Sequence, residues 1–213
     1  GAESEPATLV VSLHPWSSDL DGGRNPDLEE LVYERGWIYL WPNFRGRNNT
    51  CEALGSELAQ QDILDAVAWV KEKYPVNDKR VFLTGRSGGG HMTMLMCGRY
   101  PEVWAGAVSW VGISDLAEWH ETHKDGNYGE MIRQALGGAP GHSDAIDAEL
   151  KARSPITHMA NAKDVAIHIA AGRHDGHKGS VPISQSLRAF NEIANANGGA
   201  LITEDEIEQM SRP

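Results

Sequence analysis

Residues 81–92 read VFLTGRSGGGHM, an apolar run followed by a single serine among glycines. The apolar run is typical of a buried strand, and residues 88 to about 100 have the pattern of a helix. A strand that runs through Gly85-Arg86-Ser87-Gly88-Gly89 into a helix forms the G-x-S-x-G turn that exposes a nucleophilic serine. Ser87 would need a positive φ angle there, and the flanking glycines would let the strand and the helix approach closely. The stretch therefore predicts a nucleophile at Ser87 and an oxyanion donor at the amide of Gly88.

Other glycine-rich turns compete with this interpretation. The dinucleotide motif G-x-G-x-x-G would need glycine at 87 or 93, where the sequence has Ser87 and Thr93. A P-loop would need a lysine and a hydroxyl residue where His91 and Met92 stand. Both phosphate-binding motifs are excluded by spacing, which leaves an ordinary glycine-rich turn as the alternative to a nucleophile turn.

Around this turn, strand-like runs alternate with segments of helical period, as in βαβ units whose parallel sheet is covered on both faces. We expect one α/β domain over residues 1–213, a three-layer αβα sandwich with a mostly parallel, doubly wound sheet. Residues 114–160 have helical pieces without a strand pattern and predict a helical insertion. The predicted strands are 9–13, 37–40, 81–84, 107–111 and 165–170. The predicted helices are 26–35, with Asn25 as its N-cap, a second that Ser56 caps and Pro75 ends, 88–100 and 183–196.

The composition narrows the classes of partner. The chain has 30 acidic and 19 basic residues, a formal net charge of -11, which repels nucleic-acid phosphates and anionic lipids. The sequence contains no apolar run of about 18 residues, the length that a membrane helix needs. We expect a soluble chain that binds neither nucleic acid nor membrane. A signal peptide removed before Gly1 stays compatible with this sequence, so the compartment is open, as is the oligomeric state. Cys51 and Cys97 have neither disulfide-framework nor zinc spacing.

Acyl transfer needs a second oxyanion donor and an acid. The run LVVSLHPWSSD places a loop after the first strand, where the amide of Trp16 is the favoured donor and Ser17 the next choice. For His14, a place in a turn is favoured over a catalytic role. For the acid, Asp175 follows the last predicted strand in VAIHIAAGRHDGHKGSVP. Asp115 is the fallback, although its place in ISDLAEW also suits a helix N-cap.

Two segments, DILDAVAWVKEKYPVNDKRVFLTGRSGGGHM and GRHDGHKGSVPISQS, resemble the prolyl oligopeptidase-like and dienelactone-hydrolase-like branch of the α/β-hydrolase family. The resemblance covers about residues 7–196. It implies a Ser, Asp, His triad in that chain order, with Ser87 and Asp175 as its first two members. It also implies ester or peptide hydrolysis through an acyl-enzyme, without metal or cofactor. The six-residue spacing from Asp175 to Val181-Pro182 departs from the usual three.

The catalytic histidine of the triad is the larger departure from the pattern of this family. In the family it follows one more strand beyond the acid, but the only histidine after Asp175 here is His177, too close in sequence to turn back easily. The chain also begins at what would be the third strand of the family sheet. We therefore expect an incomplete α/β-hydrolase domain that lacks the N-terminal strands and the C-terminal strand with the catalytic histidine. His120 and His123 have an i, i+3 spacing that is only a weak metal signal. The other histidines read as loop, helix-end or packed residues: His91, His142, His158, His168 and His174.

These observations favour a serine hydrolase that cleaves carboxylic esters. The alternatives are a peptidase of the prolyl oligopeptidase type and a noncatalytic binding protein that keeps the fold without the base. The expected substrate is a small ester or a short peptide. We expect Trp110, Trp119 and Arg86 to line its pocket, and core packing is the alternative for the two tryptophans.

Overall fold

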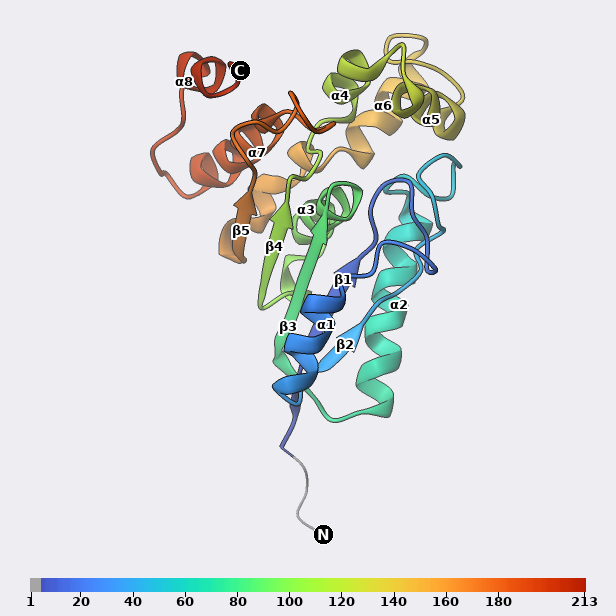
Figure 1. Ribbon diagram of the computed structural model, residues 1–213, viewed down its shortest axis with the longest axis vertical. Helices are drawn as coiled ribbons and strands as arrows, with labels where there is room; N and C mark the ends of the chain where they lie inside the picture. Colours follow the sequence, from blue (N-terminus) through green and yellow to red (C-terminus); the bar gives the residue numbers. More distant parts are fainter. Residues whose placement is uncertain (1–4) are drawn as a thin grey trace.

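The computed structural model describes residues 5–213, and its centre is a sheet of five parallel strands in the order β2-β1-β3-β4-β5 (Figure 1). The strands are β1 (Ala7–Leu13), β2 (Ile38–Leu40), β3 (Val76–Arg86), β4 (Gly106–Trp110) and β5 (Ala166–Ala170). All five coincide with the predicted strands. β3 begins five residues earlier than expected, because Val76 pairs with Ala7 ahead of a register shift in β1. Residues 77–80 are all polar, so the sequence there has no apolar strand pattern that would predict this extension.

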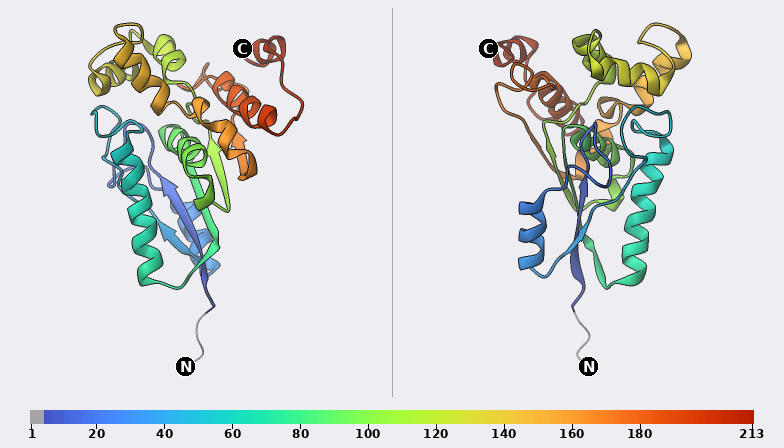
Figure 2. Two further views of the ribbon diagram at one scale, coloured as in Figure 1. Left: turned by 180° about the vertical axis from the view of Figure 1, so that it is seen from behind. Right: turned by 45° about the vertical axis from the view of Figure 1, so that its right-hand side comes forward.

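Helices cover the sheet from both sides. Helix α1 (Pro26–Glu34) lies on one face, and α2 (Glu57–Lys73) and α3 (Gly88–Arg99) lie on the other. The right-hand view of Figure 2 shows α1 and α2 on opposite sides of the sheet. Both α1 and α2 begin at the predicted caps, where the side chains of Asn25 and Ser56 accept backbone N–H bonds. The main core lies between the sheet and α2 and α3, and includes fully buried Ile63, Leu83 and Leu95. The predicted three-layer arrangement is confirmed.

The segment after β4 forms the predicted helical insertion. It contains α4 (Leu116–His123), α5 (Asn127–Leu136) and α6 (Asp144–Arg153), followed by two short 3₁₀ turns, η2 (Pro155–Thr157) and η3 (Met159–Asp164). Its own core cluster joins it to Trp16 of the loop after β1 and to Val181 of the loop after β5. The insertion therefore packs on the carboxyl edge of the sheet, where both of those loops emerge (Figure 1).

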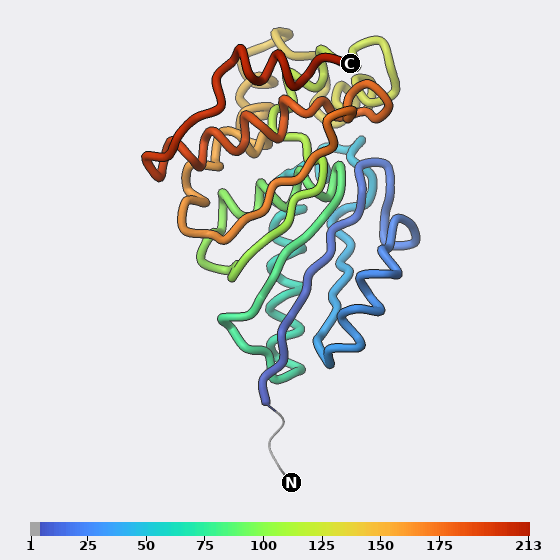
Figure 3. The backbone as a smooth tube through the Cα atoms, turned by 60° about the vertical axis from the view of Figure 1, so that its left-hand side comes forward, coloured from blue at the N-terminus to red at the C-terminus, as the bar shows by residue number. Residues whose placement is uncertain are grey.

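Two helices follow β5. Helix α7 (Ile183–Ala196) was predicted, and a further helix, α8 (Glu204–Met210), was not. A capping box starts α8, in which Thr203 and Glu206 bond each other's backbone N–H groups. The tube in Figure 3 shows α8 lying beyond α7, away from the sheet. None of the helices among residues 5–213 combines the length and apolarity required to cross a membrane.

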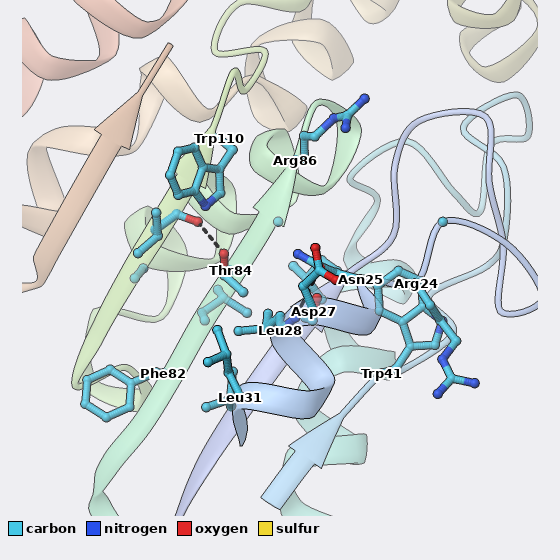
Figure 4. A pocket seen from close by; sticks show the side chains of 18 of the residues that line it. Arg24, Asn25, Asp27, Leu28, Leu31, Trp41, Phe82, Thr84, Arg86 and Trp110 are labelled. Carbon is cyan, nitrogen blue, oxygen red and sulfur yellow. Dashed lines mark hydrogen bonds between the residues drawn. The ribbon is translucent and has the colours of Figure 1, made fainter. Parts of the chain in front are cut away.

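The α1 side of the sheet has an open groove of about 890 Å³ beside that helix (Figure 4). Its walls are mainly apolar, because β1, β3 and β4 present side chains to this face and α1 covers only part of it. Parallel sheets are normally buried on both faces, and here Leu31, Phe82 and Trp110 stay 48%, 36% and 52% exposed. The groove is therefore an apolar part of the sheet that α1 leaves open.

Candidate active site

The turn from β3 to α3 has the geometry that a nucleophile turn requires. Ser87 has φ 57° and ψ -116°, close to the mirror image of an ordinary extended residue, so the conformation is strained for a residue with a side chain. A hydrogen bond of 2.9 Å from the Ser87 amide to the carbonyl of Trp110 holds the turn, and Ser87 is half-buried. A Cβ atom on Gly85 would lie 2.4 Å from Gly89, so only glycine fits there. The side chain of Ser87 makes no capping bond to the helix that it precedes.

The residues of the two predicted oxyanion donors lie close together. A Cβ atom on Gly88 would be 2.4 Å from both the amide nitrogen and the Cα of Trp16, so the first residue of α3 closely approaches the loop after β1. We call residues 14–25 the oxyanion loop. Its Trp16 side chain is 2% exposed, and its Trp16 carbonyl accepts a bond from Asn48 at 3.1 Å. Ser17, the second choice, is exposed and turns its hydroxyl toward the sulfur of Met131.

Asp175 lies in the loop of residues 171–182 between β5 and α7, which we call the acid loop. Its Oδ2 accepts a hydrogen bond of 2.6 Å from the amide of Gly172, and its own amide donates to the carbonyl of Gly172. Gly176 has φ 90° and packs against Pro182, so the loop turns sharply after the acid. The side chain is half-buried at the same edge as β3 and β4 end. Among residues 5–213, no hydrogen bond joins Asp175 to Ser87 or to a histidine.

Asp115, the fallback acid, caps a helix instead. Its Oδ1 accepts bonds of 2.9 and 3.0 Å from the amides of Ala117 and Glu118 at the start of α4. A carboxylate committed to two backbone donors is poorly placed to orient an imidazole. The structure therefore favours the N-cap interpretation of Asp115.

The histidine side chains lie in different environments, and among residues 5–213 none of them hydrogen-bonds the side chain of Ser87 or of Asp175. His91, one turn along α3, is fully buried and bonds the carbonyl of Arg153 at 2.8 Å. His177 bonds the carbonyl of Ser211, beyond α8. The remaining bonded or stacked histidines contact Phe44 (His14), Arg133 (His120), Ser180 (His123) and Ala152 (His158), and the exposed ones are His142, His168 and His174.

Burial controls the charge of two histidines near the site. Desolvation, opposed by the bond to the Arg153 carbonyl and aided by the positive charge of Arg153, lowers the pKa of His91 to about 4. Desolvation also lowers the pKa of His14, which stacks on Phe44 with 3.7 Å between ring centroids. Both imidazoles are therefore neutral near pH 7 and belong to the supporting structure of the loops and of α3.

The three predicted pocket residues divide between two environments. Trp110 is 52% exposed and lines the groove on the α1 side of the sheet together with Arg86, whose register partner it is in the sheet (Figure 4). Trp119 is fully buried, so the core-packing alternative describes it and the pocket interpretation was wrong. Its indole N–H instead bonds the acid loop at the carbonyl of Ser180. No local sequence signal identifies that bond, since its partners are 61 positions apart.

No group of three or more histidine, cysteine, aspartate or glutamate side chains within residues 5–213 is arranged to hold a metal ion. Of the two possible histidine ligands in the insertion, His120 accepts a bond from Arg133 and His123 faces a backbone carbonyl. Their spacing therefore reflects the packing of α4 against its neighbours.

Comparison with known proteins places this geometry in a family. The family model described as the prolyl oligopeptidase family matches residues 27–206. The dipeptidyl aminopeptidase BIII of Pseudoxanthomonas mexicana is 26% identical over 226 residues, which cover all of this chain and 32% of that protein. Acetylxylan esterase A of Aspergillus awamori is 40% identical over 116 residues, 50% of this chain and 38% of that protein. The chain thus spans about a third of the length of these relatives.

The fold also resembles solved structures of peptidases. An acylaminoacyl peptidase of Pyrococcus horikoshii superposes with a TM-score of 0.76 at 20% identity, covering 95% of this chain and 33% of that one. Prolyl oligopeptidase B of Galerina marginata superposes with a TM-score of 0.72 at 17% identity, covering 98% of this chain and 31% of that one. The parallel sheet with its flanking helices is therefore an α/β-hydrolase fold. With a family match that spans most of its residues, the chain belongs to the prolyl oligopeptidase family.

Proposed function

We propose that this chain carries the nucleophile, the oxyanion donors and the acid of a serine hydrolase that cleaves carboxylic esters. The observation that carries the proposal is the strained positive φ of Ser87 at the junction of β3 and α3, directly before Gly88, whose backbone lies close to that of Trp16. Such strain persists only where surrounding structure enforces it, and it gathers at active sites.

In the proposed reaction, the Ser87 hydroxyl oxygen attacks the ester carbonyl carbon while a histidine base takes its proton. The carbonyl oxygen becomes an oxyanion, which the amides of Gly88 and Trp16 stabilise. The C–O bond to the alcohol breaks, the protonated base gives its proton to the departing alcohol, and an acyl-enzyme remains on Ser87. Water then attacks the acyl-enzyme in the same way, which releases the carboxylic acid product and restores the Ser87 hydroxyl. Asp175 orients the imidazole and stabilises its positive charge.

The base is the part that residues 5–213 do not provide at Ser87. His91 follows Ser87 by one helical turn, but it is fully buried and its Nε2–H points to the Arg153 carbonyl. His177 is occupied by Ser211. We propose that the base belongs to a segment outside the present 213 residues, in the order Ser, Asp, His that the family resemblance implies. Loss of a triad base costs on the order of 10⁶-fold in turnover, so activity depends on that segment.

Ester cleavage is supported by the esterase relative, whose identity of 40% over half of this chain exceeds the 26% of the peptidase relative. Peptide cleavage is the second candidate, because the peptidase relative aligns with the whole chain. Hydrolysis of p-nitrophenyl acetate and of aminoacyl amides by the full-length protein would separate them. A higher kcat/KM for the ester supports our proposal, and a higher kcat/KM for the amides replaces it with the peptidase.

A fluorophosphonate probe tests the nucleophile directly, because such probes phosphonylate only activated serines. We expect the full-length protein to be labelled at Ser87, as located by peptide mass spectrometry, and Ser87→Ala to stay unlabelled. Ser109→Ala is a control of matched chemistry, since Ser109 is fully buried and donates its hydroxyl to the Gly90 carbonyl. No labelling of a folded full-length protein would reject the enzyme and leave a binding protein on the same fold.

A further inference from the structure

Two side chains of α4 hold the end of the acid loop through one carbonyl oxygen. The indole Nε1–H of Trp119 donates to the carbonyl of Ser180 at 2.8 Å, and Nε2 of His123 bonds the same oxygen. A carbonyl can only accept, so His123 must carry its proton on Nε2, and the two lone pairs of the oxygen accommodate both donors. Trp119 and His123 are four residues apart and share one face of the helix. These two bonds hold Ser180, which follows Asp175 by five residues, against α4.

Trp119 also packs against the oxyanion loop. Its side chain is fully buried, and its ring meets that of Trp16 edge to face, with centroids 4.5 Å apart at an angle of 66°. The next residue of the acid loop, Val181, is 2% exposed and belongs to the same cluster. One side chain therefore bonds the loop that carries the proposed acid and contacts the loop that carries a proposed oxyanion donor.

The helix that carries this contact is itself firmly attached. At the start of α4, the amides of Ser114 and Asp115 both donate to Oε1 of Gln185 at 2.8 Å, and the Ser114 hydroxyl donates to the Gln185 carbonyl. Ser114 and Gln185 are 0% and 1% exposed, so water does not compete for these bonds. Arg188 of α7 adds an ion pair of 2.6 Å to Glu118. Helix α4 is thus a fixed support for the acid loop.

We propose that Trp119 and His123 are positioning residues that fix the acid loop, and with it Asp175, relative to the oxyanion loop. Neither group touches the reacting atoms, since Trp119 is fully buried and His123 is occupied by the Ser180 carbonyl. This inference rests on the proposed function, because the relative placement of Asp175 and Trp16 affects a reaction only if both belong to the catalytic site.

Three variants isolate the contact. Trp119→Phe removes the indole donor and keeps an aromatic ring, and His123→Phe removes the second donor while keeping a ring beside Trp119. His123→Gln restores an N–H donor at that position. The matched control is Trp104→Phe in the main core, because Trp104 is 4% exposed and its Nε1 donates to the carbonyl of Met96 at 3.2 Å.

Hydrogen–deuterium exchange of the full-length protein, followed on peptides of residues 171–182, reads out the position of the loop. Loss of one bond to the Ser180 carbonyl should speed exchange in the acid loop about tenfold in Trp119→Phe and His123→Phe. We expect His123→Gln to restore the wild-type rate, and Trp104→Phe to lower Tm without changing loop exchange. Unchanged loop exchange in both phenylalanine variants, or an equal rise in Trp104→Phe, would overturn the proposal.

The rate of fluorophosphonate labelling at Ser87 gives the catalytic readout. It should fall in Trp119→Phe and His123→Phe, recover in His123→Gln, and stay at the wild-type rate in Trp104→Phe. Labelling that is equally fast in all variants would contradict a positioning role even if the loop loosens. A wild-type protein that is not labelled at all would instead contradict the proposed function, and the exchange experiment would still decide whether α4 fixes the loop.

Discussion

The amide nitrogen of Trp16 lies 2.4 Å from the point that a Cβ atom on Gly88 would occupy. Because Gly88 is the first residue of α3 and Trp16 lies in the oxyanion loop, this close approach places two backbone amides of separate segments beside the turn at Ser87. The proposed oxyanion site therefore depends on a position where no side chain fits.

Replacing Gly88 by alanine should break this approach. The added methyl group would overlap the backbone of Trp16, which cannot move away as a flexible side chain would, so we expect a loss of about 1–3 kcal/mol in the free energy of unfolding. Fluorophosphonate labelling of Ser87 should fall with it. Gly126→Ala is the control, because its new Cβ would meet its nearest atom at an ordinary 3.5 Å. Equal stability of the two variants in urea denaturation would contradict the geometry.

The strain at Ser87 predicts opposite effects on stability and activity. Ser87→Gly removes the nucleophile and relieves a backbone conformation that glycine adopts freely, so we expect it to be more stable than Ser87→Ala by about 1 kcal/mol. Both variants should be unreactive toward the probe. Thermal unfolding of the two variants measures the difference, and a less stable glycine variant would mean that the turn is not strained.

The buried His91 predicts a loss of stability in acid. Its folded-state pKa of about 4 lies below the ordinary value of 6.5, so the unfolded chain binds the proton more tightly. The stability that neutral His91 provides is complete above pH 6.5 and is lost as the pH falls from 6.5 toward 4. The loss amounts to about 3 kcal/mol, at about 1.36 kcal/mol for each unit of pKa.

Urea denaturation between pH 4 and 7 measures this dependence. His91→Gln keeps an N–H donor for the Arg153 carbonyl and cannot titrate, so its stability should fall less steeply over the same range. The stability of His91→Gln should still depend on pH, because burial lowers the pKa of His14 and also that of His120. Identical slopes for wild type and His91→Gln would show that His91 is not buried as a neutral group.

The two candidate acids make separable predictions. Asp175→Asn removes the charge that would stabilise a protonated histidine, and we expect turnover to fall on the order of 10⁴-fold with little change in Tm. Asp115→Ala removes the cap of α4 and should cost about 1 kcal/mol of stability while turnover persists. Steady-state kinetics and thermal unfolding of both variants decide between them, and the reverse pattern would assign the acid to Asp115.

The groove on the α1 side should bind apolar dyes. Leu31 and Phe82 are 48% and 36% exposed within it, and exposed apolar patches of this kind bind such probes. We expect Leu31→Gln and Phe82→Gln to weaken the fluorescence of bound ANS. Leu58→Gln is the control, since Leu58 is 49% exposed on α2, on the opposite side of the sheet. Equal dye binding by all three variants would place the apolar surface elsewhere.

The sequence alone determined the five strands, the helices α1, α2, α3 and α7, the helical insertion and the turn at Ser87. Those features follow from local chemistry: the apolar runs, the caps Asn25 and Ser56, and the glycines that a positive φ and a close helix require. Helix α8 also begins at a local sequence pattern, the Thr203–Glu206 capping box, but it was not predicted.

Tertiary structure alone decided which side chains meet. Trp110 and Trp119 looked alike as pocket residues, but one is 52% exposed on an open face and the other is fully buried between two loops. The contact of Gly88 with Trp16 and the bond from Trp119 to Ser180 join segments 72 (88 minus 16) and 61 positions apart. Such contacts depend on how the sheet and the insertion pack, because burial is a property of the assembled core and not of any local pattern.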